Sequence, residues 1–209
     1  MIIPGRYVTL RPLTPDDAEI TQRWRTSGRA FLLNKGAQSV AEQRTWIRSR
    51  EKYVEAGTEY NFVMVLSPRP SHFATGVIVP EELRRQPQPV GMISLVDIDM
   101  THKRAEAAHF LIGEEGAVKG MPVAFEAVKL LYELAFDTLG LERLWGPVAS
   151  GNRGMLTFHK YMGYRECGRL PSHYILNGLY HDAIFIQLDV DTYRAVTLPK
   201  LNRLIGAKS

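Results

Sequence analysis

The sequence predicts a single α/β domain in which a mixed β-sheet is flanked by helices. Two observations lead to this fold class. The 209 residues are 45% hydrophobic, so the chain can bury one sizeable core without disulfide bridges or a structural metal. Strand and helix patterns follow one another as strand, two helices, several strands, long helix, strand, helix and strands. We place the domain at residues 1–195 and expect residues 196–209 to form a loosely attached C-terminal tail.

The N-terminal part begins with a strand that is followed by two helices. Tyr7–Arg11 alternates apolar and polar residues, which predicts the first strand. Thr14 is a suitable N-cap for a helix that has Pro15 at its first position. Ser39 and Glu42 have the spacing of a capping box, which predicts the start of a second helix.

Two strand patterns follow, at Tyr60–Leu66 and Val90–Val96, and five prolines lie between them. Proline removes a backbone donor and interrupts both helices and strands. We therefore expect residues 67–89 to form a long, proline-rich insertion loop, and loops of this length are usually functional or partly disordered.

The C-terminal part alternates strand and helix and ends in a hairpin. The expected elements are a strand at Glu106–Ile112, a helix from Pro122 to about Thr138, a strand at Arg143–Ala149, a helix at Asn152–Met162, and two strands within Tyr174–Leu188 that turn at Asn177-Gly178.

Charge and cysteine content narrow the class of protein. Cys167 is the single cysteine, which excludes a disulfide scaffold and fits a reducing, cytoplasmic compartment. No apolar run approaches the roughly 20 residues that span a bilayer, so we expect no membrane association. The net charge of +4 suits an anionic cofactor. Without an interleaved basic and aromatic pattern it gives no support for nucleic-acid binding.

The segment Gly113–Gly120 is a candidate anion-binding loop, because it joins a predicted strand to the start of a helix. The first N–H groups of a helix have no partner within the helix, and the helix dipole makes this end positive. Lys119 adds a mobile positive charge beside it. The loop is neither a P-loop nor a dinucleotide-binding fingerprint, because it lacks Gly-Lys-Ser/Thr and the required glycine spacing. Glycine in this position can also serve the turn alone.

A second candidate segment, Asn152–Tyr164, opens directly after a predicted strand. Asn152 is placed as a helix N-cap, and capping alone would account for it. His159 shares a helix face with Met155, one turn earlier. A histidine there is either packed and hydrogen-bonded or, because its ordinary pKa is near neutral, able to give a proton to a leaving group.

Taken together, these segments resemble the GNAT acetyltransferase superfamily, and within it the RimJ/RimL-like branch, from Tyr7 to about Arg194. The similar segments, in chain order, are Tyr7–Ala18, Val118–Pro122 with Ala124–Ala127, Asn152–Tyr164 with Arg165–Gly168, and Asn177–Asp182, which has the pattern Asn-Gly-x-Tyr-x-Asp. The resemblance implies a mostly antiparallel central sheet with helices on both faces. It also implies a V-shaped splay between two parallel strands, here the one ending near Ile112 and the one at Leu144–Ser150.

The resemblance further implies transfer of an acetyl group from acetyl-CoA to a primary amine by direct attack, with no metal required. The residues that it assigns to cofactor binding are Ile112, Val118, Lys119, Gly120, Met121, Val123 and Asn152. His159 occupies the position where many members have a tyrosine that protonates the thiolate, which makes it the candidate general acid. Glu106 could relay a proton from the amine through water, or could be only an exposed carboxylate at the end of a strand.

Two residues depart from the family pattern in the cofactor loop. Ala117 stands where the family usually has Arg or Gln, and Pro122 stands where it has a second glycine or an alanine. Proline is acceptable at a helix start but removes one N–H that would face phosphate. We therefore expect weaker cofactor binding, or compensation by Lys119, and the alternative is a non-catalytic GNAT-like binding module.

We expect the acceptor to be a small-molecule amine, with a nucleotide-linked amino sugar slightly favoured. The residues that favour it are Arg23–Arg25, Ser39, Gln43, Trp46, His159 and His173–Asp182. Aminoglycosides and protein N-termini of the ribosomal type are the alternative acceptors. Exposed sheet edges of such folds often pair, so a homodimer is also expected to be accessible.

Overall fold

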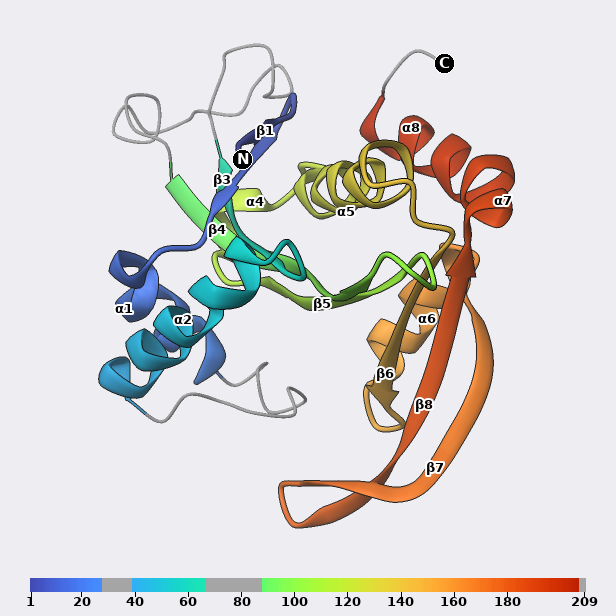
Figure 1. Ribbon diagram of the computed structural model, residues 1–209. Coiled ribbons are helices and arrows are strands. Elements are labelled where there is room, and N and C mark those ends of the chain that lie inside the picture. The colour runs from blue at the N-terminus through green and yellow to red at the C-terminus, as the bar shows by residue number, and fades with distance from the viewer. Residues whose placement is uncertain (28–38, 67–87, 207–209) are drawn as a thin grey trace.

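An eight-stranded sheet forms the centre of the fold in the computed structural model, which describes residues 1–27, 39–66 and 88–206. Figure 1 shows the arrangement of the strands and helices. The strand order is β1-β2-β3-β4-β5-β6-β8-β7. The neighbours β5 and β6 are parallel, and all the other neighbouring pairs are antiparallel. The predicted α/β class with a mixed, mostly antiparallel sheet is confirmed.

Most strands and helices lie close to their predicted positions, but β7 begins at Arg165, well before the expected Tyr174. The strands are β1 Ile3–Pro4, β2 Val8–Pro12, β3 Tyr60–Leu66, β4 Gln88–Asp99, β5 Arg104–Ile112, β6 Arg143–Ala149, β7 Arg165–Leu176 and β8 Leu179–Asp189. The helical segments are η1 Pro15–Asp17, α1 Ala18–Arg25, α2 Val40–Glu55, α4 Glu115–Val118, α5 Val123–Glu133, η4 Leu134–Thr138, α6 Arg153–Tyr161, α7 Val190–Thr192, η5 Tyr193–Thr197 and α8 Leu198–Ile205. Most of the predicted insertion, residues 67–87, lies outside the described residues, and its last two positions belong to β4.

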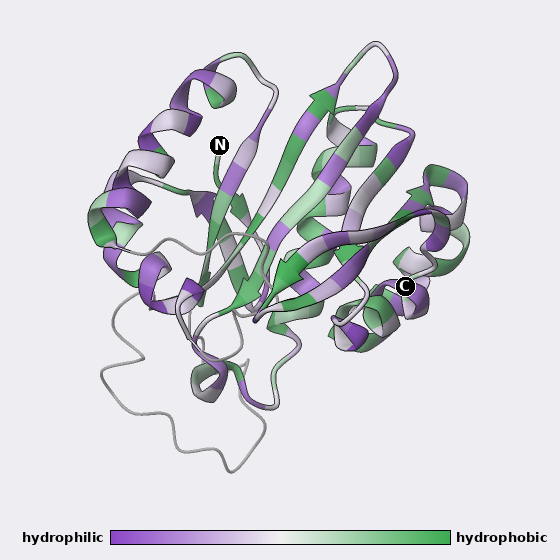
Figure 2. Cartoon of the chain, turned by 90° about the horizontal axis from the view of Figure 1, so that it is seen from below, coloured by the Kyte–Doolittle hydropathy of each residue, from purple (hydrophilic) through white to green (hydrophobic). Residues whose placement is uncertain are grey.

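Helices cover both faces of the sheet, as the alternation of side chains along the strands requires. In β3, Phe62, Met64 and Leu66 join the large core cluster that contains α5 and α8. Val63 and Val65 point to the other face and pack with Trp24 of α1. Hydrophobic and hydrophilic residues alternate along several strands in Figure 2. None of the helices in the described ranges has the length and apolar content to cross a membrane.

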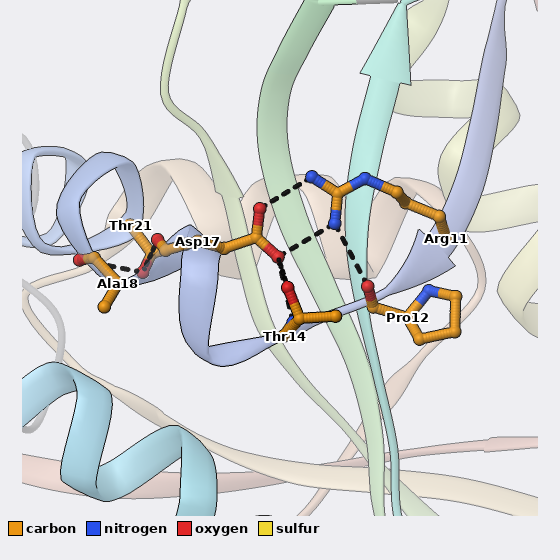
Figure 3. Close-up of polar contacts among 6 residues, drawn as sticks. All are labelled: Arg11, Pro12, Thr14, Asp17, Ala18 and Thr21. Carbon is orange, nitrogen blue, oxygen red and sulfur yellow. Dashed lines mark hydrogen bonds and ion pairs between the residues drawn. The ribbon is translucent and has the colours of Figure 1, made fainter.

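A buried aspartate fixes the connection between β2 and α1 (Figure 3). Arg11 donates to both oxygens of the Asp17 carboxylate, at 2.8 and 2.6 Å, and the N–H and hydroxyl of Thr14 donate at 2.9 and 3.0 Å. Burial alone would raise the pKa of Asp17, but these hydrogen bonds outweigh it and lower the pKa. The Thr21 hydroxyl donates to the Asp17 carbonyl, and the Gln43 side chain of α2 donates to Thr21. This network holds α1 and α2 against one end of the sheet.

The hairpin at the C-terminal end of the sheet extends beyond the rest of the molecule (Figure 1). Its turn residues Asn177 and Gly178 both have positive φ, at 51° and 76°, which matches the expected two-residue turn. Most of β7 is exposed, and the exposed apolar residues of the hairpin are Leu170, Ile175, Leu179 and Tyr180. The hairpin therefore presents a long, uncovered edge strand.

The predicted loose tail is wrong for Leu198–Ile205, which forms the helix α8. Leu201 and Ile205 are 0% and 4% exposed, and both belong to the core cluster. The helix packs on α5 and ends at Gly206, whose φ is 69°. The segment is too short for its sequence pattern to predict a helix, and burial of its apolar face holds it in place.

Leu201→Ala should therefore destabilise the protein by about 2–5 kcal/mol, because it leaves a cavity under α8. The exposed Arg203 on the same helix offers the control Arg203→Ala, which should change stability little. Denaturant unfolding of the two variants measures the difference. Equal and small changes in stability for the two variants would mean that α8 contributes as little to stability as a loose tail.

Candidate active site

The two parallel strands β5 and β6 pair at one end only. Their register runs from Arg104 opposite Arg143 to Glu106 opposite Trp145 and then stops. Beyond this point β5 continues to Ile112 and β6 continues to Ala149 without pairing with each other. The predicted V-shaped splay is present in the structure, and its vertex lies at Glu106.

Local irregularities in both strands accompany the splay. In β5, His109 has a φ of 54°, and the register with β4 shifts between Ala108 and Leu111, as in a β-bulge. A bulge bends its strand and increases the local twist. In β6, Pro147 has no backbone N–H and cannot extend the ladder with a donor. Together these features favour separation of the strands.

A cavity of about 370 Å³ lies at the splay and is lined by residues from helices on both faces of the sheet. We call it the splay cavity. On the α1/α2 side of the sheet its walls include Arg25 and Glu106, together with His109, whose ring contacts Trp46 of α2. On the α5 side its walls come from α5 and α6. Its lining residues on α5 and α6 are Val128, Leu131, Tyr132, Met155, Phe158 and His159.

Glu106 lies at the vertex of the V and lines the splay cavity. Burial raises the pKa of its carboxyl group to about 7, with a further contribution from the negative charge of Asp97. The group is therefore poised to gain or lose a proton near neutral pH. The exposed-carboxylate alternative does not describe it, because most of its side chain is shielded from solvent.

His159 faces the splay cavity from α6, on the opposite side of the sheet from His109. Its ring lies 4.6 Å from that of Tyr164, and its Nδ1 atom is buried without a hydrogen-bond partner in the described ranges. Burial lowers the pKa of His159 to about 4. The ring is therefore neutral at physiological pH, so it can offer an N–H group there but is not an imidazolium acid.

Two buried tyrosines lie behind His159. The hydroxyl of Tyr164 donates to that of Tyr132 at 2.8 Å, and burial raises the pKa of both groups. Tyr132 also lines the splay cavity. The sequence pattern of α5 gave no sign of this pair, because a tyrosine at helical spacing is ordinarily a core residue. Only the meeting of α5 with the segment after α6 brings the two hydroxyls together.

Asn152 performs its expected capping role and also lines the splay cavity. Its Oδ1 accepts a hydrogen bond from the N–H of Met155 at 3.2 Å. The cap fixes the side chain at the junction of β6 and α6. A contact between Asn152 and a cofactor stays a prediction.

The candidate anion loop leads into α5 through Lys119, Gly120, Met121 and Pro122. Gly120 has a φ of 78°, which favours glycine, and Pro122 is the N-cap. The N–H groups of Val123, Ala124 and Phe125 find no acceptor within the described part of the chain. They form the positive end of the helix and can bind an anion. Pro122 removes one donor from this end but leaves these three.

The remaining cofactor residues of the prediction contribute differently. The side chain of Val123 is fully buried in the core, so only its backbone is placed to meet a ligand. Ile112 and Val118 are partly buried against the same core. Lys119 is exposed beside the loop, where its ammonium group can reach solvent or a bound anion.

Gly113 has a role that the sequence did not indicate. Its φ is not among the positive values, so the turn itself does not require glycine. A Cβ atom at this position would lie 2.2 Å from Cγ of Trp24, whose indole packs directly on the glycine. The Trp24 Nε1 group donates to Glu114 at 2.8 Å, and Arg23 pairs with the same carboxylate. Glycine therefore allows α1 to lie against the end of β5.

The described geometry has a counterpart among known proteins. The model of the "Acetyltransferase (GNAT) domain" family matches residues 8–165. The chain belongs to the GNAT acetyltransferase family. The predicted membership of this family is thereby confirmed.

Several relatives carry more specific names. Over 196 residues the chain is 29% identical to "Putative ribosomal N-acetyltransferase YdaF" of Bacillus subtilis, covering 88% of this chain and 92% of the relative. It is 32% identical over 94 residues to spermidine N(1)-acetyltransferase of Escherichia coli, covering 45% of this chain. The match spans only about half (49%) of that relative's length.

Solved structures share the fold at lower sequence identity. A spermidine N-acetyltransferase from Vibrio cholerae in complex with CoA and spermine superposes with a TM-score of 0.69 at 20% identity, covering 91% of this chain and 99% of the other. A GCN5-related N-acetyltransferase from Brucella melitensis gives a TM-score of 0.72 at 19% identity, covering 98% and 85% of the two chains.

Gly113→Ala should push the Trp24 indole away and lower the melting temperature, because the new methyl group overlaps the ring. Gly116 is the matched control: it lies in α4 with open space around its Cα, so Gly116→Ala should be tolerated. Thermal unfolding with tryptophan emission as the probe follows both effects. Equal melting temperatures of the two variants would show that the packing of Trp24 on Gly113 does not contribute to stability.

Proposed function

We propose that the protein transfers an acetyl group from acetyl-CoA to a primary amine of a small molecule. The observation that carries this proposal is the splay cavity, which has a titratable carboxyl group at its vertex and a helix start with unpaired N–H groups at the neighbouring loop. When bound, acetyl-CoA supplies an activated thioester. The residues present fit it, because they offer both an anion site and a channel through the sheet.

In this proposal, the acetyl donor and the acceptor amine bind on different sides of the sheet. The N–H groups of Val123, Ala124 and Phe125, with Lys119 nearby, would hold the diphosphate. The unpaired inner edges of β5 and β6 carry backbone donors and acceptors that would hold the pantetheine arm. This leaves the α1/α2 side of the cavity for the acceptor amine.

Glu106 is the proposed base. An amine enters as an ammonium ion and must lose one proton before its nitrogen lone pair can attack the carbonyl carbon. Because its pKa is about 7, Glu106 can take this proton directly or through water and release it to solvent. The C–N bond then forms and the C–S bond breaks. The second nitrogen proton ends on the departing sulfur.

His159 is the proposed group beside that sulfur. Its neutral ring can donate a hydrogen bond to the thiolate, which stabilises the negative charge as the bond breaks. This role replaces transfer of a proton from an imidazolium ion, which the lowered pKa disfavours at neutral pH. Asn152, at the same end of the cavity, is proposed to contact the cofactor.

Three kinds of amine are candidate acceptors: an amino sugar, a protein N-terminus and a polyamine. Of the residues expected to favour an amino sugar, Trp24 and Gln43 are buried and have structural partners, whereas Arg25 lines the cavity and Trp46 contacts a lining residue. A protein N-terminus is the second candidate, favoured by the match along most of YdaF. A polyamine is suggested by the names of other relatives.

Release of free thiol from acetyl-CoA tests the proposal. The amines to compare are a nucleotide-linked amino sugar, spermidine, an aminoglycoside and a short peptide with a free N-terminus. We expect the amino sugar or another small amine to turn over. Turnover of the peptide alone would favour the ribosomal-type alternative, and binding of acetyl-CoA without any transfer would favour a non-catalytic module.

Glu106→Gln should lower kcat at saturating amine by about 100-fold near pH 8, because an amide cannot take the proton. In the unaltered protein kcat should rise with pH and level off above about 7, the pKa of Glu106. The variant should lose this rise.

His159→Ala is the control for the pH profile. It should lower kcat but keep the rise near pH 7, because His159 is already neutral there. A rise that persists in Glu106→Gln, or that vanishes in His159→Ala, would contradict the assignment of the base.

A further inference from the structure

His109 combines a strained backbone with a side chain in the splay cavity. Its φ of 54° lies in the left-handed region, which is uncommon for residues other than glycine, although Asn, Asp and His adopt it more often than the rest. The other non-glycine residues of positive φ in the described ranges are Asp97, Lys103, Ser172 and Asn177, and none of them lines the cavity. Strain of this kind persists where the surrounding structure enforces it, and it often marks a functional position.

The packing around His109 leaves its Nδ1 atom without a hydrogen bond in the described ranges. The edge of Trp46 contacts the ring at a centroid distance of 5.4 Å, and the Arg25 guanidinium lies over that indole at 5.6 Å. The Nδ1 atom of His109 is buried and has no hydrogen-bond partner in the part of the chain that the structure describes. Packing alone would be served better by an apolar residue, because a buried, unpaired nitrogen costs free energy.

Burial and nearby positive charges keep the His109 ring neutral. Burial is the main cause that lowers its pKa to about 4, and Arg25 of α1 and Arg50 of α2 lower it further. Glu106 lies on the same strand and Asp97 lies on β4, next to Glu106. A neutral imidazole has one nitrogen that accepts a hydrogen bond. The same positive groups disfavour an ammonium ion, which helps to keep a bound amine uncharged.

We propose that His109 binds the acceptor amine and orients it for attack. Its ring accepts a hydrogen bond from an N–H of the amine. His109 lies three residues after Glu106 on β5 and on the same side of the cavity. The amine nitrogen is then held between Glu106 and the open part of the splay cavity, with its lone pair directed toward the carbonyl carbon of the thioester. This assignment rests on the proposed function and concerns the acceptor side alone.

Three substitutions of His109 separate recognition from backbone strain. His109→Gly relieves the positive φ but removes the ring, and His109→Leu keeps bulk without an acceptor atom. His109→Asn keeps both tolerance of positive φ and a side-chain oxygen that can accept the hydrogen bond. Acetyl-CoA binding by calorimetry and amine kinetics with the four-amine panel are measured for each variant.

We expect the Gly and Leu variants to lose about tenfold or more in kcat/KM for the amine, as for one lost hydrogen bond. Their affinity for acetyl-CoA should be unchanged, and the rise of kcat near pH 7 should persist because Glu106 is intact. The Asn variant should recover most of the loss. Thermal unfolding should show the Gly variant to be at least as stable as the unaltered protein.

Two results would overturn the assignment while leaving the proposed function intact. One is an unchanged kcat/KM in His109→Gly. The other is a loss in His109→Asn as large as that in His109→Gly, which would mean that the imidazole only packs. If the unaltered protein neither binds acetyl-CoA nor acetylates any of the four amines, the proposed function fails, and the assignment of His109 fails with it.

Discussion

The arrangement of the site depends on the loss of pairing between β5 and β6 beyond Glu106 and Trp145. A parallel pair inside a sheet ordinarily satisfies its backbone groups along its whole length. Here the two strands separate, so a cavity crosses a sheet that would otherwise be a closed wall. Helices on both faces can then contribute to one site, which neither face could form alone.

The same separation sets the electrostatics of the cavity. Glu106 lies where the strands part, shielded enough that its pKa rises to about 7, while burial on either side of the sheet lowers the pKa of His109 and His159 to about 4. Near neutral pH one carboxyl group titrates between two neutral rings. An exposed carboxylate has a low pKa and binds a proton from the amine only weakly at neutral pH. A shielded carboxylate with a pKa near 7 binds that proton more strongly and is therefore the better base.

Much of the framework could be predicted from local sequence patterns, because caps, turns and alternation act over a few residues. Thr14, Ser39 and Asn177-Gly178 occupy the positions expected of them. The splay was expected only from the resemblance to a family, since no local pattern states where two distant strands stop pairing. The helix α8 was missed although Leu198, Leu201 and Ile205 repeat at helical spacing, because the segment is short and follows an apparent end of the domain.

Contacts between distant segments account for the other differences. Gly113 was interpreted as a turn residue, but it is required by Trp24, which lies far from it in sequence. The conformation of His109 accompanies a register shift with β4, and its ring is neutral because of burial and, in addition, arginines from two helices. Such features follow from the assembled fold, so the residue types alone did not mark them.

Calorimetric titration with acetyl-CoA tests most directly whether the splay is the cofactor channel. We predict one-to-one binding in the micromolar range by the unaltered protein. Ala149 lines the cavity at the end of β6 that does not pair with β5, so Ala149→Trp should fill the channel and abolish binding while the circular dichroism spectrum stays the same. Absence of binding by the unaltered protein, or equal binding by a folded Ala149→Trp variant, would contradict the account.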